Sequence, residues 1–98
     1  MRRNVAIRIS GAEELEKVLN ILFSVGFVFN NEKRINNFDK FCKIYADHKY
    51  NRWVGWSWVA LGKDRECKMV LDAYTVQPLG SARITVEEVV ELVKQNNW

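Results

Sequence analysis

The chain has 98 residues, of which 48% are hydrophobic and 12% aromatic, and its formal net charge at pH 7 is +3. This length indicates one domain over residues 1–98, and the apolar content is enough for a packed core, which excludes wholesale disorder. No stretch approaches the roughly 18 consecutive apolar residues of a membrane-spanning helix, so a cytoplasmic protein without membrane contact is expected.

The first third of the chain predicts a strand, a helix and a second strand. Apolar residues alternate over 5–9, which is typical of a strand. Ser10 and Glu13 match a capping box that opens a helix, and Gly26 stands where a left-handed C-terminal cap belongs. A short strand at 27–29 follows. The apolar face of the helix is predicted from residues at helical spacing, which are Leu15, Val18, Leu19, Leu22 and Phe23.

The middle of the chain predicts three further strands. The polar, asparagine-rich segment 30–39 indicates a loop, and residues 41–46 are interpreted as a strand with Cys42 and Ile44 on one side. A long strand is expected at 53–61. A hairpin turn at 62–65 then leads into its antiparallel partner at 66–76.

The C-terminal segment predicts a second helix, because Thr85 and Glu88 match another capping box. The predicted order is β-α-β-β-β-β-α. We expect an α+β domain with an antiparallel sheet and both helices packed on one of its faces. The residues expected in the core from helical spacing are Leu15, Leu19, Leu22, Val89, Val90 and Val93.

Three of the four tryptophans, Trp53, Trp56 and Trp58, fall within six residues of one predicted strand. Because neighbouring strand residues face opposite sides of a sheet, Trp56 and Trp58 are predicted mainly in the core and Trp53 at the edge or on the open face. Trp53 and its neighbour Arg52 are then expected to be functional anchors. An open aromatic face is a binding surface or a dimer interface, so a homo-oligomer through this face is a further expectation.

No catalytic or metal-binding pattern stands out, and no enzyme activity, metal or cofactor is predicted. Cys42 and His48 are interpreted as a buried thiol and a loop histidine rather than a nucleophile pair. The two cysteines and the histidine include no close-spaced pair that could chelate zinc. Cys42 and Cys67 are expected to be reduced, since no secretory signal precedes the domain.

Charge is unevenly distributed along the chain. The segment 33–52 carries six basic and two acidic residues, whereas 66–98 carries three basic and five acidic ones, which predicts a basic end and an acidic end. Cationic and aromatic residues are interleaved in 47–53, a composition suited either to a protein partner or to phosphates and bases. The alternative to a binding role is structural, with 47–53 as a solvated loop whose Tyr50 and Trp53 lie at the edge of the core. The predicted binding residues are Arg34, Lys43, Lys49, Tyr50, Arg52, Trp53 and Trp56.

The first third of the chain resembles small accessory proteins of bacteriophages. The likeness lies in 5–10, 13–15 and 22–30, and 84–89 is similar to their closing helix. The resemblance implies a non-enzymatic protein that binds and inhibits or sequesters a host component, such as a defence protein, or captures a small acidic ligand. The alternative is a nucleotide- or nucleic-acid-binding module that uses the same basic and aromatic residues.

Overall fold

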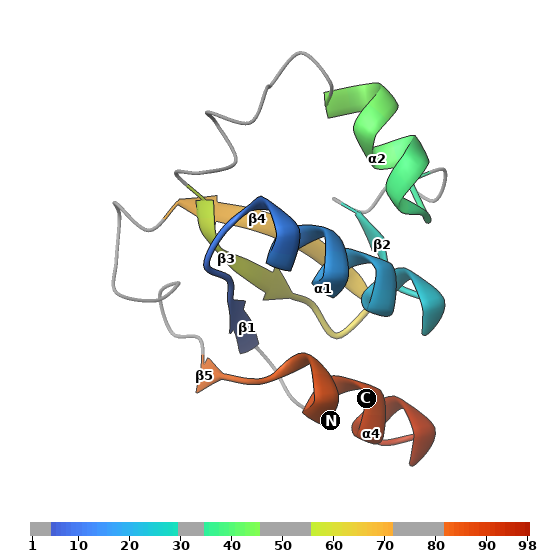
Figure 1. Cartoon of the computed structure of the whole chain (residues 1–98). Helices are drawn as coiled ribbons and strands as arrows, with labels where there is room; N and C mark the ends of the chain where they lie inside the picture. The colour runs from blue at the N-terminus through green and yellow to red at the C-terminus, as the bar shows by residue number, and fades with distance from the viewer. Residues whose placement is uncertain (1–4, 30–34, 46–55, 72–81) are drawn as a thin grey trace.

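The computed structural model describes residues 5–29, 35–45, 56–71 and 82–98, which form five strands and three helices (Figure 1). Their order in the chain is β1 (Val5–Arg8), α1 (Ala12–Ser24), β2 (Val28–Phe29), α2 (Phe38–Tyr45), β3 (Trp56–Leu61), β4 (Glu66–Leu71), β5 (Ala82–Arg83) and α4 (Val86–Lys94). The α+β class predicted from the sequence is confirmed.

The sheet is mixed, so the prediction of a purely antiparallel sheet is wrong. Its strand order is β2-β4-β3-β1-β5, with β3 antiparallel to both β1 and β4. The outer pairs β1–β5 and β2–β4 are parallel. Short links favour antiparallel neighbours, and β3 and β4 obey that rule. The parallel pairs join strands that are far apart in the chain and separated by helices, as parallel pairing requires.

Of the segment predicted as a strand at 41–46, residues 41–45 instead belong to helix α2, and residue 46 lies outside the described part of the chain. Phe38, Phe41 and Cys42 follow a helical spacing rather than strand alternation. The helix begins after Asn37, whose side-chain oxygen accepts a hydrogen bond from the backbone N–H of Lys40 at 2.8 Å. Asparagine is a preferred N-cap residue, so the asparagine-rich stretch interpreted as a loop also contained the start signal of this helix.

The remaining strands of the sheet are β3, β4 and β5. The predicted strands 53–61 and 66–76 are confirmed over β3 and β4, and their remaining residues lie outside the described part of the chain. Strand β5 was not predicted, because two residues are too short to show alternation. Through β5 the chain returns beside β1, with the backbone N–H of Ile84 donating to Ala6 at 2.9 Å.

The two predicted capping boxes have different outcomes. At α4, the Thr85 hydroxyl accepts from the backbone N–H of Glu88, and the Glu88 carboxylate accepts from the backbone N–H of Thr85, so this box is confirmed. At α1, the N-cap is Gly11 with φ +148° and no side-chain cap bond, so that box is wrong. Ser10 instead donates its hydroxyl to the carboxylate of Glu14 at 3.0 Å.

Helix α1 ends as its sequence predicts. Gly26 has φ +95°, in the left-handed region, and its N–H donates to Phe23. The N–H of Phe27 donates to the carbonyl of Leu22 at 3.0 Å. These two bonds form a Schellman cap, which turns the chain directly into β2.

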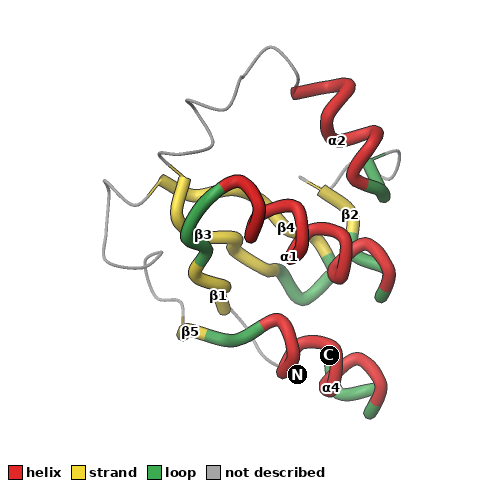
Figure 2. Tube along the Cα trace, in the orientation of Figure 1, coloured by secondary structure: helices red, strands yellow, loops and turns green. Residues whose placement is uncertain are grey.

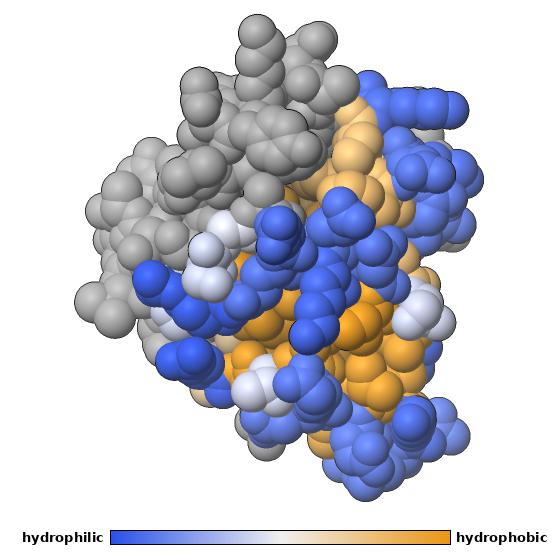
Figure 3. Space-filling view, viewed as in Figure 1, coloured by the Kyte–Doolittle hydropathy of each residue, from blue (hydrophilic) through white to orange (hydrophobic). Residues whose placement is uncertain are grey.

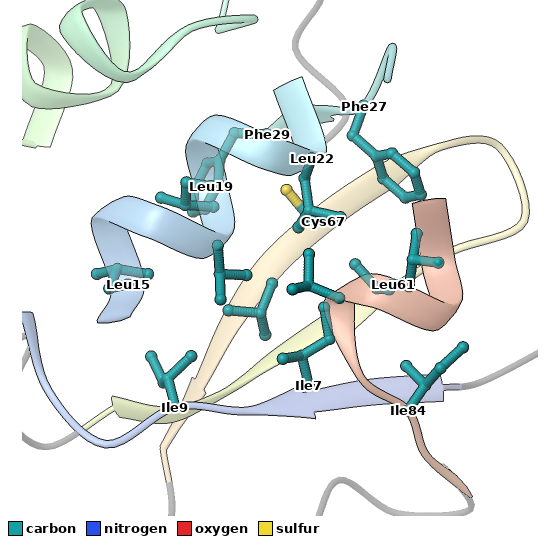
Figure 4. Packing of buried hydrophobic residues seen from close by; sticks show 14 of the residues in the cluster. Ile7, Ile9, Leu15, Leu19, Leu22, Phe27, Phe29, Leu61, Cys67 and Ile84 are labelled. Atoms are coloured by element: carbon teal, nitrogen blue, oxygen red, sulfur yellow. The ribbon is translucent and has the colours of Figure 1, made fainter. Parts of the chain in front are cut away.

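The core lies between one face of the sheet and the helices (Figures 2 and 4). Helices α1 and α4 contact each other above that face, as predicted, and α2 joins them through Phe41, whose ring meets Phe29 edge-on at 4.9 Å. Of the six predicted core residues, Leu15, Leu19, Leu22 and Val89 are fully buried, whereas Val90 and Val93 are only half-buried. Helical spacing identifies the apolar stripe of α4 but overstates how wide its buried part is.

The C-terminal residues close one end of the core. The indole N–H of Trp98 donates to the carbonyl of Gly62 at 3.2 Å, in the turn between β3 and β4. Its ring also meets Phe27 edge-on at 5.5 Å. These contacts tie the end of the chain to the β3–β4 hairpin and to the end of α1.

Leu19→Ala is expected to lower the free energy of unfolding by about 2–5 kcal/mol, because Leu19 is fully buried in the centre of α1. Glu16→Ala, on the exposed side of the same helix, is expected to change it by less than about 0.5 kcal/mol. Urea denaturation measures both. Equal denaturation midpoints for Leu19→Ala and the wild type would contradict the assignment.

Thr85→Ala is expected to destabilise the protein by about 1 kcal/mol, because it removes the side-chain cap of α4. Ser10→Ala is the matched control and is expected to cost less than about 0.5 kcal/mol, since its hydroxyl bonds only an exposed carboxylate. In thermal melts, Thr85→Ala should therefore unfold at a lower temperature than Ser10→Ala. A larger loss for Ser10→Ala would show that α1 is capped by Ser10 after all.

Candidate functional site

Most of the predicted binding residues lie outside the described part of the chain. These are Arg34, Lys49, Tyr50, Arg52 and Trp53. Lys43 is exposed on α2, which is a helix rather than the predicted strand. Trp56 begins β3, and its backbone pairs with Leu71. The candidate site is therefore built from described residues that the sequence did not single out.

The pairing register assigns side chains to the two faces of the sheet. Ile7 pairs with Val59, and Leu61 with Cys67, and these buried residues face the helices.

The opposite face contains a row across four strands, because Ala6 pairs with both Arg83 and Ala60, and Ala60 pairs with Lys68. The next row contains Arg8, Trp58 and Val70. We call this surface the basic face.

Trp58 lies on the basic face and not in the main core. It is 3% exposed, yet it does not belong to the hydrophobic cluster beneath the helices. The guanidinium carbon of Arg8 lies 5.4 Å from the centroid of its ring, which is a cation–π contact. The prediction that Trp58 is buried is confirmed, but its predicted position in the helix-covered core is wrong.

Strand alternation holds at Trp58, and the choice of the helix-covered face was the error. Trp58 shares its face with Ala60 as predicted, but Val59 and Leu61 are the residues that face the helices. The prediction assigned the face with two tryptophans to the helices because of its larger apolar area. Nearer the start of β3, Trp56 pairs with Leu71 and Trp58 with Val70, so β3 contains one more residue than β4 between these pairs, which is a β-bulge.

The basic face differs in charge from the helical side. Its cations Arg8, Lys68 and Arg83 are exposed, whereas Ala6 is fully buried and both Ala60 and the acid Glu66 at the edge are half-buried. On the helical side, the acids outnumber the lysines in both α1 and α4; they are Glu13, Glu14, Glu16, Glu87, Glu88 and Glu91, against Lys17 and Lys94. In α1, α4 and the described strands, acids therefore collect on the helical side and cations on the opposite face. Most basic residues of the predicted basic segment 33–52 lie outside the described part of the chain.

A cleft of about 560 Å³ opens at the edge of β1, beyond the end of β5. Arg8 and Arg83 line one side of it, and Ile84 lies at the start of the turn into α4. Glu14 and Lys17 of α1 line another side, next to Glu87 of α4. The cleft connects the basic face to the helical side, so a partner on the basic face can reach the first turns of both helices.

The two thiols are not activated for nucleophilic chemistry. Burial, followed by the neighbouring carboxylate of Glu66, raises the pKa of Cys67 to about 12. Burial, followed by Glu16 and Asp39, also raises the pKa of Cys42. Both cysteines are free in the structure. Since the thiolate is the reactive form, both side chains are protonated and weakly reactive at neutral pH; His48, the other member of the pair considered above, lies outside the described residues.

Neither a metal centre nor a membrane-spanning helix is found in the described ranges. Residues 5–29, 35–45, 56–71 and 82–98 contain no group of three or more histidine, cysteine, aspartate or glutamate side chains able to hold a metal ion. In the same residues, no helix combines the length and apolar character needed to cross a membrane.

Comparisons with known proteins do not place the chain in a family. It matches no protein-family model, no curated protein and no solved structure. The geometry of the described residues is therefore the evidence available for function.

The stability of the protein is expected to fall as the pH rises from about 9 toward 12, because of Cys67. Folding raises the pKa of the Cys67 thiol to about 12, whereas the ordinary pKa of a cysteine thiol is 9.0. Between these values the unfolded chain binds fewer protons, so the free energy of unfolding decreases by up to about 1.4 kcal/mol per pH unit.

Urea denaturation at pH 8 and at pH 10.5, for the wild type and Cys67→Ala, measures this contribution. Other groups titrate in the same range, so the informative quantity is the difference in slope between the two proteins. Cys67→Ala is less stable at pH 8 but should lose less stability on going to pH 10.5. If the wild type and Cys67→Ala lose the same amount of stability between pH 8 and pH 10.5, the Cys67 thiol does not determine how stability changes with pH.

Proposed function

We propose that this protein is a non-enzymatic accessory protein of the bacteriophage type that binds an acidic host component through its basic face, and so inhibits or sequesters it. The observation that carries the proposal is the pairing register, which gathers the exposed cations Arg8, Lys68 and Arg83 on one side of the sheet. Complementary charge steers association and selects partners. The resemblance of the first third of the chain to phage accessory proteins supports a host protein as the partner.

The composition of the basic face also supports binding rather than catalysis. Ala6 and Ala60 form its middle, flanked by Arg83 on one side and Lys68 on the other. Ala6 is fully buried and Ala60 half-buried, so the surface that a partner can contact in this row is formed by the flanking cations. Arginine is enriched at binding hot spots, and Arg8 is held in place by its contact with Trp58.

The alternative, a nucleotide- or nucleic-acid-binding module, receives less support from this face. Stacking of bases uses aromatic rings whose faces are exposed. Trp58 is buried, and the Arg8 guanidinium lies over its ring, so this part of the face offers charge without a stacking platform. The aromatic residues that would serve the alternative, Tyr50 and Trp53, lie outside the described residues.

The proposal can be tested by capture from a bacterial lysate, with and without nuclease. The immobilised variants are wild type, the double variant Lys68→Glu/Arg83→Glu on the basic face, and the double variant Lys40→Glu/Lys94→Glu on exposed helical positions. Both doubles change the net charge equally. We expect the wild type and the helical double to retain the same host protein after nuclease treatment, and the basic-face double to retain roughly tenfold less.

Two results would contradict the proposal. Capture that disappears with nuclease and weakens steeply with salt would favour the nucleic-acid alternative. If the two double variants lose the same amount of captured host protein, binding depends on net charge and not on the basic face.

A further inference from the structure

An apolar groove runs between α1 and α4, on the side of the molecule opposite the basic face. Figure 3 shows it as an orange band between the blue surfaces of the two helices. It is a cavity of about 260 Å³ lined by Ile21 of α1 and by Val86, Val90, Glu87 and Glu91 of α4. Val86 and Glu87 also line the larger cleft described above, so the two hollows adjoin.

Two apolar side chains on the floor of the groove keep part of their surface exposed. Ile21 and Val90 are both half-buried. Val90 was expected in the core from its helical spacing but is only half-buried, whereas Ile21 packs against the core cluster. A valine in this position leaves apolar surface accessible at the groove, and such surface marks interaction sites when polar residues surround it.

The rim of the groove is acidic. Glu87 and Glu91 lie one helical turn apart on the α4 side and are exposed. Neither lysine nor arginine occurs among the described residues that line the groove, although the whole chain is basic. The adjoining cleft is balanced, with Glu13, Glu14 and Glu87 against Arg8, Lys17 and Arg83. The acidic charge of the rim selects a basic occupant.

We propose that this groove binds a basic amphipathic helix of a partner protein. The nine residues of α4 span about 13 Å at a rise of 1.5 Å per residue, which matches two turns of a partner helix. Apolar side chains at positions i, i+3 or i+4, and i+7 of that helix fill the floor over Ile21 and Val90, and flanking lysines or arginines face Glu87 and Glu91. The site is independent of the basic face, which takes an acidic partner.

The test uses a synthetic probe, because the natural partner is unidentified. The probe is a fluorescent 14-residue peptide of leucine, alanine and lysine with its leucines at helical spacing. Its controls are a scrambled peptide of the same composition and a version with every lysine replaced by glutamate. We expect saturable binding of the helical basic peptide by fluorescence anisotropy, and binding at least about tenfold weaker for both controls.

A matched pair of charge reversals locates the site. Glu91→Lys reverses a charge on the rim of the groove, whereas Glu16→Lys makes the same change at an exposed position of α1 that does not line it. Glu91→Lys is expected to weaken binding of the probe about fivefold or more, and Glu16→Lys less than about twofold. Val90→Lys should abolish binding, whereas Val90→Leu should preserve it.

The proposal is overturned if the wild type does not bind the probe, if the scrambled peptide binds equally well, or if the two charge reversals have the same effect. Unchanged binding by Val90→Lys also overturns it, because the groove floor would then not be the site. Circular dichroism checks the fold of each variant. If Val90→Lys does not fold, the comparison of Glu91→Lys with Glu16→Lys still decides the question.

Discussion

The antiparallel pairing of β3 with β1 on one side and β4 on the other determines how the rest of the molecule is arranged. Its register places Val59 and Leu61 beneath the helices and turns Trp58 and Ala60 to the opposite side. Because cross-strand partners share a face, this one strand also positions Arg8 and Lys68. The parallel strands at the two edges then extend both surfaces, and β5 adds Arg83 to the basic face.

The same arrangement separates the two kinds of charge. Helices that follow β1 and β5 return over one side of the sheet, and their first turns hold glutamates that the helix dipoles stabilise. The strand residues that point away from those helices are free to be cationic. A molecule with an acidic helical side and a basic sheet side offers two surfaces of opposite charge.

Trp58 shows why a tryptophan-rich strand was informative and yet misleading. Its burial agrees with the expectation that an indole seeks an apolar environment. Its face does not agree, because the prediction assigned the face with two tryptophans to the helices, whereas the smaller Val59 and Leu61 lie there. The surrounding cations were not recognised as a site either. Arg8, Lys68 and Arg83 come from three strands that are distant in the sequence, and only their register brings them onto one surface.

The sequence by itself determined the elements whose signals are local. Helix α1 with its Gly26 cap, helix α4 with its Thr85 box, and the β3–β4 hairpin all follow from spacing, capping and turn residues within a few positions of one another. Only the tertiary structure decided the features that depend on contacts between distant segments. Strand β5 exists because Ala82 and Arg83 meet the edge of β1. Helix α2 has local signals in its Asn37 cap and its apolar spacing, and the contact between Phe41 and Phe29 fixes its place on the core. The parallel edges, the basic face and the acidic groove have the same origin: strand order and register are properties of the assembled sheet, and no local pattern encodes them.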